Sequence, residues 1–587
     1  MRAYHNSRLS EYRKPFGAIN TGGTVSLSID LFEESGAEIV LRTWVDGEGE
    51  AFYPMKKNPM DDRVRYSCEL KCEEAALYWY SFRIDRADGT CMYYGAKQGS
   101  TGGEGIMYFG NPPSFQITCH KERKLPEWYR NAVVYQIFPD RFYRGESFDK
   151  KFDGEKMLLS DDARRGPGRV LWNDWYRTPE YDREHDGRIK NWDFYGGTLN
   201  GIREKLGYLE SIGITAIYLN PIFEAASNHR YDTADYTKID SLLGTEEDFA
   251  CLCREAEAKG ISIILDGVFN HTGCDSIYFN RYGNYPEKGA CQGEDSPYYD
   301  WFSFKEDGSY DCWWGVDDLP NVRENDESYR NFIFGDENSI VRRWLRLGAK
   351  GWRLDVADEL PDDFIAGIKD AVIAEKGEDG LLMGEVWEDA SHKISYSRLR
   401  KYFLGDELDC VMNYPFRDGI EQFIIGNISA FDLAERLMSL YENYPRENFY
   451  GNLNLLGSHD RMRVLTLFGN APGEYSMSDE DKKNYRLNAG QKDLALGRLW
   501  LAALTQMAMP GVPCIYYVMK RAWKVSAIRT TGVLSRGAER TKTQAIYIEM
   551  QRHLESSIQC WSMVTSSRLP LMTMFSVYTE EAKENLF

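Results

Sequence analysis

Three carboxylates in this 587-residue chain stand directly after short apolar runs, where catalytic groups are common. Asp355 follows Gly-Trp-Arg-Leu, Glu385 follows Leu-Leu-Met-Gly, and Asp460 follows Leu-Asn-Leu-Leu-Gly-Ser-His. A single carboxylate in such a place is usually a helix cap or a surface charge. Three of them at successive strand ends are harder to explain in that way. Carboxylates held together can act as nucleophile, general acid or general base.

The apolar runs that carry these groups alternate with helical stretches from about residue 131 onward. Eight runs predict strands: 133–137, 216–219, 261–265, 351–355, 381–385, 411–413, 453–456 and 513–517. Strands that are buried on both faces and separated by helices form parallel sheets. Eight of them predict an α/β fold of the (β/α)8 TIM-barrel type, in which the working residues lie at the carboxyl ends of the strands.

Additional units precede and interrupt the predicted barrel. Residues 1–122 contain short alternating strands separated by Gly and Asp, which predicts an N-terminal β-sandwich. The barrel is expected over 123–517. A Tyr-, Trp- and Gly-rich stretch at about 270–337 follows the third strand. An insertion of that length is typical of a functional loop or a small subdomain.

The composition excludes several classes of function. Lys and Arg number 71 against 91 Asp and Glu, and a net charge of −20 argues against nucleic acid and anionic membranes as main partners. The uncharged run 499–519 contains two prolines and suits a buried helix and strand better than a membrane span. The amino terminus shows no signal peptide and the 12 cysteines form no zinc-binding set, so we expect buried thiols and a cytoplasmic location.

Four motifs in order mark a resemblance to a known family. They read DGVFNH at 266–271, GWRLDVADE at 351–359, GEVWE at 384–388 and LLGSHD at 455–460. The chain resembles the α-amylase superfamily, family 13 of the glycoside hydrolases, over about 131–517. The leading β-domain, YQIFPDRF at 135–142 and LPNV at 319–322 are similar to the branch of neopullulanases, cyclomaltodextrinases, maltogenic amylases and amylopullulanases. That resemblance implies a starch-binding-like N-terminal domain.

The resemblance implies a retaining mechanism with a covalent glycosyl-enzyme intermediate. Asp355 matches the nucleophile, Glu385 the acid/base and Asp460 the third carboxylate, which binds sugar hydroxyls. Retaining hydrolysis places the nucleophile and the acid about 5–5.5 Å apart. Arg353 lies two residues before Asp355 on the same strand face, and its charge is expected to keep Asp355 ionised. The family's substrate-binding positions are matched by His229, Tyr231, His271, Arg353 and His459.

The activity implied is that of an α-glucan hydrolase acting on α-1,4 and also α-1,6 glucosidic bonds. Maltodextrins, cyclodextrins, pullulan and glycogen are the substrates to consider, and α-glucan oligosaccharides are the expected partners. A transglycosylase of the same superfamily is one alternative, with Asp358 and Glu359 near the acceptor side. An inactive or binding-only product is another alternative. A homodimer through the N-terminal domain is left open.

No cofactor is expected to be required, and calcium binding stays open. Many relatives bind calcium through Asn, Asp and a Gly-Asp pair near the first strand. Here that stretch reads Arg-Gly-Glu-Ser-Phe-Asp at 144–149, and Gly197 is followed by Thr198. Few carboxylates remain there for a hard cation. Asn270 and Asp266 are weak candidates for the other calcium site of the superfamily.

The resemblance ends at Tyr517. Relatives continue Gly-Asp-Glu-Ala-Gly-Met-Glu-Gly after this strand, whereas this chain reads VMKRAWKV. Loss of one base after the Tyr517 codon accounts for the difference, because the shifted codons permit the relatives' residues at many consecutive positions. We therefore predict that 518–587 is translated out of frame and replaces the last barrel helix and the C-terminal β-domain.

Overall fold

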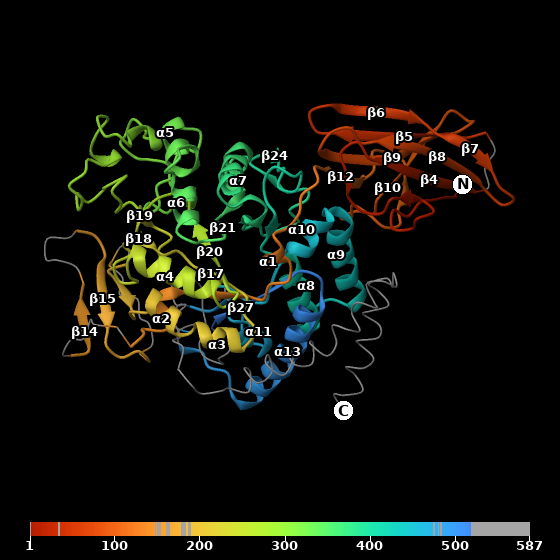
Figure 1. Cartoon of the computed structure of the whole chain (residues 1–587). Helices are drawn as coiled ribbons and strands as arrows, with labels where there is room; N and C mark the ends of the chain where they lie inside the picture. Colours follow the sequence, from red (N-terminus) through yellow and green to blue (C-terminus); the bar gives the residue numbers. More distant parts are fainter. Residues whose placement is uncertain are drawn as a thin grey trace.

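The computed structural model describes residues 2–32, 36–146, 148, 154–159, 165–177, 184–185, 189–473, 476–478, 481 and 484–517. The predicted out-of-frame segment, 518–587, lies outside these residues. Figure 1 shows the N-terminal strands gathered at one side of the molecule, next to a central barrel and its surrounding helices. No helix within the described ranges is long and apolar enough to cross a bilayer.

The described N-terminal residues form two β-sheets around one apolar core, which confirms the predicted sandwich. One sheet has the order β1-β4-β8-β7 with β2 beside β4, and the other has the order β11-β10-β9-β12-β3 with β5 and β6 attached through β9. Alternate residues of each strand enter the core, as in β4, where Val25, Leu27 and Ile29 are fully buried. The strands are β1 Arg2–Tyr4, β2 Arg13–Lys14, β3 Ile19–Asn20, β4 Thr24–Phe32, β5 Glu38–Val45, β6 Gly49–Pro54, β7 Lys56–Pro59, β8 Val64–Lys71, β9 Ala76–Asp85, β10 Cys91–Gly95, β11 Ile106–Tyr108 and β12 Phe115–His120.

Eight parallel strands in the described part of the chain form the barrel sheet, in the order β25-β22-β21-β20-β17-β13-β27-β26. A parallel bridge between Met412 and Leu453 joins the first strand of this order to the last and closes the sheet. The predicted TIM-barrel class is therefore confirmed. The strands are β13 Val134–Ile137, β17 Ala216–Leu219, β20 Ser262–Gly267, β21 Gly351–Leu354, β22 Leu381–Gly384, β25 Cys410–Val411, β26 Leu453–Leu455 and β27 Val512–Tyr516.

Helices surround the barrel, and several begin at side chains that bind free backbone N–H groups. Thr245 and Asp248 form a capping box at the start of α4, and Ser429 and Asp432 do the same for α9. The helices are α1 Glu127–Arg130, α2 Leu199–Glu204, α3 Leu206–Ser211, α4 Glu246–Glu257, α5 Glu327–Arg330, α6 Ile340–Arg346, α7 Asp362–Lys376, α8 Tyr414–Ile425, α9 Ala430–Asn443, α10 Arg446–Gly451, α11 Val464–Phe468 and α13 Ala489–Ala508.

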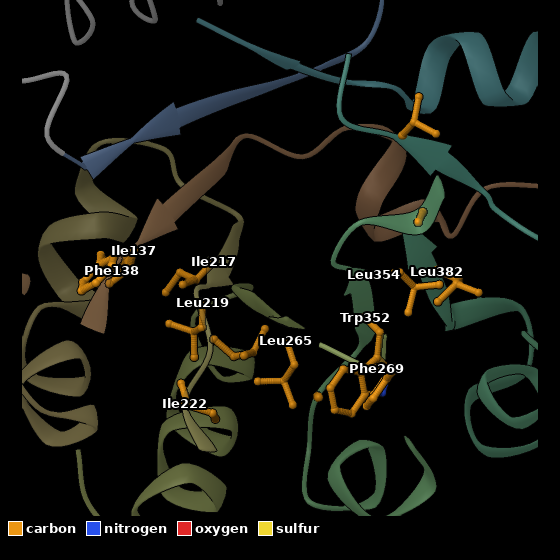
Figure 2. Packing of buried hydrophobic residues seen from close by; sticks show 14 of the residues in the cluster. Ile137, Phe138, Ile217, Leu219, Ile222, Leu265, Phe269, Trp352, Leu354 and Leu382 are labelled. Carbon is orange, nitrogen blue, oxygen red and sulfur yellow. The ribbon is translucent and has the colours of Figure 1, made fainter. Parts of the chain in front are cut away.

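The barrel strands divide their side chains between two cores because neighbouring residues point to opposite faces. Ile217, Leu265, Trp352 and Leu382 belong to the outer core, between the strands and the helices (Figure 2). On each strand, the residues that alternate with these outer-core residues point into the barrel interior. The apolar members of this inner core on the strands are Val134, Ala216, Tyr218, Ile264, Leu381, Met383, Cys410, Leu453, Leu455, Val512 and Cys514.

Two insertions extend the barrel at the ends of its strands. The stretch between β20 and α6 contains short 3-10 turns and an aromatic cluster, including Tyr278 and Trp301 with ring centroids 5.3 Å apart. A second insertion follows β13 and was not predicted from the sequence. It contains a small sheet of β14 Lys156–Leu158, β15 Gly168–Trp172 and β16 Asn191–Phe194. A separate hairpin, β18 Phe223–Ala225 with β19 Thr233–Ile239, follows β17.

Candidate active site

The alternation that fills the barrel interior continues from apolar residues into polar ones at the carboxyl ends of the strands. In β20, for example, Ile264 is an inner-core residue, and Asp266 two positions later points to the same side. The same step of two leads from Met383 to Glu385 at the end of β22. The polar side chains that share this interior side are Gln136, Asn220, Asp266, Arg353, Asp355 and Glu385. The strand pattern itself therefore brings the candidate catalytic groups together.

Arg353 forms the centre of this site. Its Nη1 atom lies 2.6 Å from Asp266 Oδ1 and 2.8 Å from Asp355 Oδ1. Its Nη2 atom lies 2.9 Å from Glu385 Oε2, and the guanidinium is fully buried. The N–H of Val356 also donates to Glu385 Oε2 over 2.9 Å, from a left-handed backbone with φ of 40°. The predicted nucleophile and the predicted acid thus meet at one planar cation.

Four carboxylates surround this one positive charge, and burial raises the pKa of three of them: Asp266, Asp355 and Asp460. Arg353 acts in the opposite direction on the pKa of Asp355, as predicted. Burial and the neighbouring carboxylates outweigh it, so the net shift is upward. The ion pair with Arg353 is therefore the interaction that favours the ionised form of Asp355, against burial and the like charges around it.

His459 links the barrel interior to Asp460. Its Nδ1 atom accepts from the amides of Gln136 and Asn220 over 3.1 and 3.2 Å. Its Nε2 atom lies 2.5 Å from the hydroxyl of Tyr231 and 3.2 Å from Asp460 Oδ2. Burial lowers the pKa of His459 well below its usual value, so the ring is neutral and carries its proton on Nε2.

Tyr231 connects this histidine to the carboxylate cluster. Its hydroxyl donates to Asp266 Oδ2 over 2.9 Å, and the hydroxyl of Tyr218 donates to the same oxygen over 2.5 Å. The ring of Tyr231 lies parallel to that of His459, with centroids 5.1 Å apart. Sequence reasoning missed Tyr218, Gln136 and Asn220. The signal that could have found them is their spacing of two residues from apolar interior residues on the first two strands.

The two remaining predicted histidines line the same region. The Nε2 atom of His271 donates to the Tyr231 carbonyl over 3.1 Å, and burial lowers the pKa of His271 to about 4. His229 accepts from the Tyr231 N–H at Nδ1 over 3.1 Å, and its ring meets Trp192 edge-on at 5.0 Å. The structure therefore places the three predicted histidines against Tyr231, and Tyr231 and Arg353 both contact Asp266.

Two exposed aromatic side chains, which sequence reasoning missed, share one carboxylate beside the site. Trp314 is 80% exposed and Tyr396 is 70% exposed. The indole N–H of Trp314 donates to Glu359 Oε1 over 3.0 Å, and the Tyr396 hydroxyl donates to Oε2 of the same residue. Both aromatic residues have φ of 49°, an uncommon conformation that is typical of functional sites. Glu359 belongs to the short turn 357–359 that follows β21 and Asp355.

The described residues do not fit a calcium site at the candidates named from the sequence. Both oxygens of Asp266 accept from Arg353, Tyr218 or Tyr231, and the amide of Asn270 donates to Glu324 over 3.1 Å. No group of three or more His, Cys, Asp or Glu side chains suited to a metal occurs among the residues described. Near the first strand, the Arg144 guanidinium contacts three backbone carbonyl groups.

Comparison with known proteins places this geometry in context. Residues 136–519 match the alpha-amylase catalytic domain. The chain is 40% identical over 562 residues to an amylopullulanase of Thermoanaerobacter thermohydrosulfuricus, covering 87% of this chain and 36% of that protein. It is 32% identical over 473 residues to neopullulanase 2 of Thermoactinomyces vulgaris, covering 78% and 67%. Its structure resembles that of the cyclic alpha-maltosyl-(1→6)-maltose hydrolase from Arthrobacter globiformis, with a TM-score of 0.57, 28% identity, and coverage of 73% and 83%. The chain thus spans little more than a third of the amylopullulanase.

Proposed function

Because the chain belongs to the α-amylase family, we propose that it is a retaining α-glucan hydrolase that cleaves α-1,4 and also α-1,6 glucosidic bonds. The observation that carries this proposal is the pairing of Asp355 and Glu385 on one guanidinium, at 2.8 and 2.9 Å. A double-displacement reaction needs two carboxylates that flank the scissile bond, one as nucleophile and one as acid. The names of the relatives, amylopullulanase and neopullulanase, support α-glucans as substrates.

In this mechanism an oxygen of Asp355 bonds to the anomeric carbon while the glycosidic bond breaks. The leaving oxygen takes a proton from Glu385, which later removes a proton from the attacking water. Among the described residues, the contacts of Glu385 with Arg353 and Val356 both fall on Oε2. The other oxygen is therefore the one that faces the leaving group.

The remaining residues have binding roles in the proposal. Asp460 accepts hydrogen bonds from sugar hydroxyls, and His459 orients it through the 3.2 Å contact. The neutral His459 and His271 rings offer N–H groups without adding positive charge next to Arg353. No step requires a metal or an organic cofactor, since the proton transfers and the nucleophile come from side chains.

Transfer to a sugar instead of water is a second candidate reaction, favoured by one observation. Trp314 and Tyr396 present exposed rings joined by Glu359, and flat rings of this kind stack on sugars. A bound acceptor sugar there competes with water for the glycosyl-enzyme. The assembled carboxylates favour an enzyme over the binding-only alternative.

Assembly and location are also proposals. We propose a homodimer through the N-terminal sandwich, supported by Trp44 and Phe52, which are 49% and 47% exposed on the outer face of β5 and β6. Sedimentation of the wild type and of Trp44→Ser tests it, and a monomeric wild type refutes it. The cysteines in the described ranges are all free thiols, which supports a reducing, cytoplasmic location.

Product analysis on maltotriose, β-cyclodextrin and pullulan tests the activity. The wild type is expected to release glucose or maltose from at least one of them, and Asp355→Ala and Glu385→Gln to lose roughly a thousandfold or more of the rate. Asp363→Asn is the matched control, because Asp363 is an exposed carboxylate of α7 that pairs with Arg330 of α5. Losses of only a few-fold in both site variants would show that the roles are misassigned.

A further inference from the structure

One arginine side chain collects backbone carbonyl groups from two separate segments beside the first barrel strand. Arg144 donates from Nε to the Tyr195 carbonyl over 2.6 Å and from Nη1 to the Asn173 carbonyl over 3.0 Å. Its Nη2 group donates to the Trp172 carbonyl. Several carbonyl oxygens around one positive centre form the environment that proteins otherwise give to a hard metal ion.

Aromatic faces complete the surroundings of this guanidinium. The Arg144 guanidinium carbon lies 5.0 Å from the ring centroid of Phe148 and 5.2 Å from that of Trp175. A planar guanidinium suits stacking on rings and donates in several in-plane directions at once. A small hydrated ion has neither property, so the site is shaped for the arginine itself.

Thr198 holds the backbone of Arg144. The Thr198 hydroxyl donates to the Arg144 carbonyl over 2.8 Å, and the Thr198 N–H donates to the Tyr143 carbonyl over 3.1 Å. The same hydroxyl accepts from the Gly201 N–H and so caps α2. Thr198 thus ties the loop to the helix through neutral hydrogen bonds.

Asp140, one of two carboxylates whose charge acts on Arg144, is already committed to protein donors. Asp140 accepts from Arg141 Nε over 2.9 Å and from the backbone N–H groups of Tyr195 and Gly196 over 3.1 Å. Arg141 adds a second guanidinium, which donates to the Asp193 carbonyl over 3.0 Å. The positive charges of these two guanidiniums repel a divalent cation and disfavour its binding in this part of the loop.

We propose that the Arg144 guanidinium is the resident cation of this loop, so that the insertion between β13 and α2 reaches its folded arrangement without calcium. Arginine stays protonated throughout the pH range in which proteins fold. The segment is therefore expected to be insensitive to calcium and to chelators. This inference does not depend on the proposed glycosidase function, because thermal unfolding, calcium binding and amide exchange are all measured without substrate.

Thermal unfolding and calcium titration of the full-length wild type provide the first test. The unfolding midpoint is expected to be the same in EDTA and in millimolar calcium chloride, and calorimetric titration with calcium is expected to show no stoichiometric binding. A midpoint that rises with calcium, together with one bound ion per chain, would overturn the proposal.

Hydrogen exchange in variants provides the second test. Arg144→Ala is expected to exchange the Glu146 and Thr198 amides about tenfold faster or more, because three carbonyls lose their charged donor. Arg144→Lys, which keeps the charge without the planar fork, is expected to fall between the two. Arg203→Ala on α2, which removes a partly exposed ion pair with Glu255 in the same region, is the matched control. Exchange in Arg144→Ala equal to that of the control refutes the proposal, and if Arg144→Ala does not fold, Arg144→Lys decides.

Discussion

Replacing Arg353 tests the electrostatic centre of the site. Arg353→Met removes the contacts at 2.8 Å to Asp355 and 2.9 Å to Glu385 from a fully buried position. Charged hydrogen bonds of this kind are worth about 1.5–3 kcal/mol each. Loss of both corresponds to roughly 3–6 kcal/mol, or roughly a 10²–10⁴-fold lower kcat/KM. Arg353→Lys keeps one charged contact and is expected to lose roughly 10–10²-fold.

The same substitution predicts the direction of a pH shift. Arg353 lowers the pKa of Asp355 and Asp460 against the effect of burial. Its removal raises both values, so a smaller fraction of the nucleophile is ionised at a given pH and the acidic limb of the kcat/KM profile moves to higher pH. The assay is kcat/KM on a chromogenic maltoside from pH 4 to pH 8, with circular dichroism to verify folding and Arg346→Met on α6 as the control. An acidic limb that stays in place or moves to lower pH would refute the reasoning.

Three further predictions concern stability and acceptor binding. Burial lowers the pKa of His5 to about 3, below its unfolded value of about 6.5. The free energy of unfolding therefore falls as the pH drops below 6.5, by about 2 kcal/mol at pH 5. His5→Gln is expected to flatten that part of the stability-versus-pH curve, and an unchanged slope contradicts the assignment. Glu442→Gln is expected to destabilise the N-terminal sandwich by about 3–5 kcal/mol, because it breaks a buried ion pair with Arg13 of β2. Proteolysis of the segment between β12 and α1 measures this, and Glu435→Gln, which removes a partly exposed partner on the same helix, is the control. Trp314→Ala and Tyr396→Ala are each expected to lower the ratio of transfer to hydrolysis products roughly 2–10-fold, and an unchanged ratio would remove these rings from the acceptor side.

The barrel could be predicted from the sequence because its signal is local and repeated. Each strand is a short apolar run, and polar groups such as Asp355 and Glu385 stand where the run ends. The start of α4, Glu246–Glu257, has a local signal of the same kind, because Thr245 and Asp248 form its capping box. The predicted run 411–413 is shorter as a strand, because β25 covers Cys410–Val411 and Met412 only bridges to Leu453.

The remaining features depend on contacts that no local pattern encodes. Asn220 and Gln136 are ordinary polar residues until the barrel closes and brings them to His459, 239 and 323 positions away. The pKa of Asp355 depends on how many carboxylates share Arg353, which requires the three-dimensional cluster. The role of Arg144 was equally hidden, because the sequence shows only that calcium ligands are missing and not what takes their place.

A covalent sugar on Asp355 is the most direct test of the account. Glu385→Gln treated with α-maltosyl fluoride is expected to glycosylate, because fluoride leaves without a proton, and then to accumulate the intermediate, because no base activates water. Mass spectrometry of the digested protein should find one maltosyl unit on the peptide that carries Asp355, and none in Asp355→Asn. A maltosyl unit on another residue, or a product of inverted configuration without any adduct, would contradict the proposed mechanism.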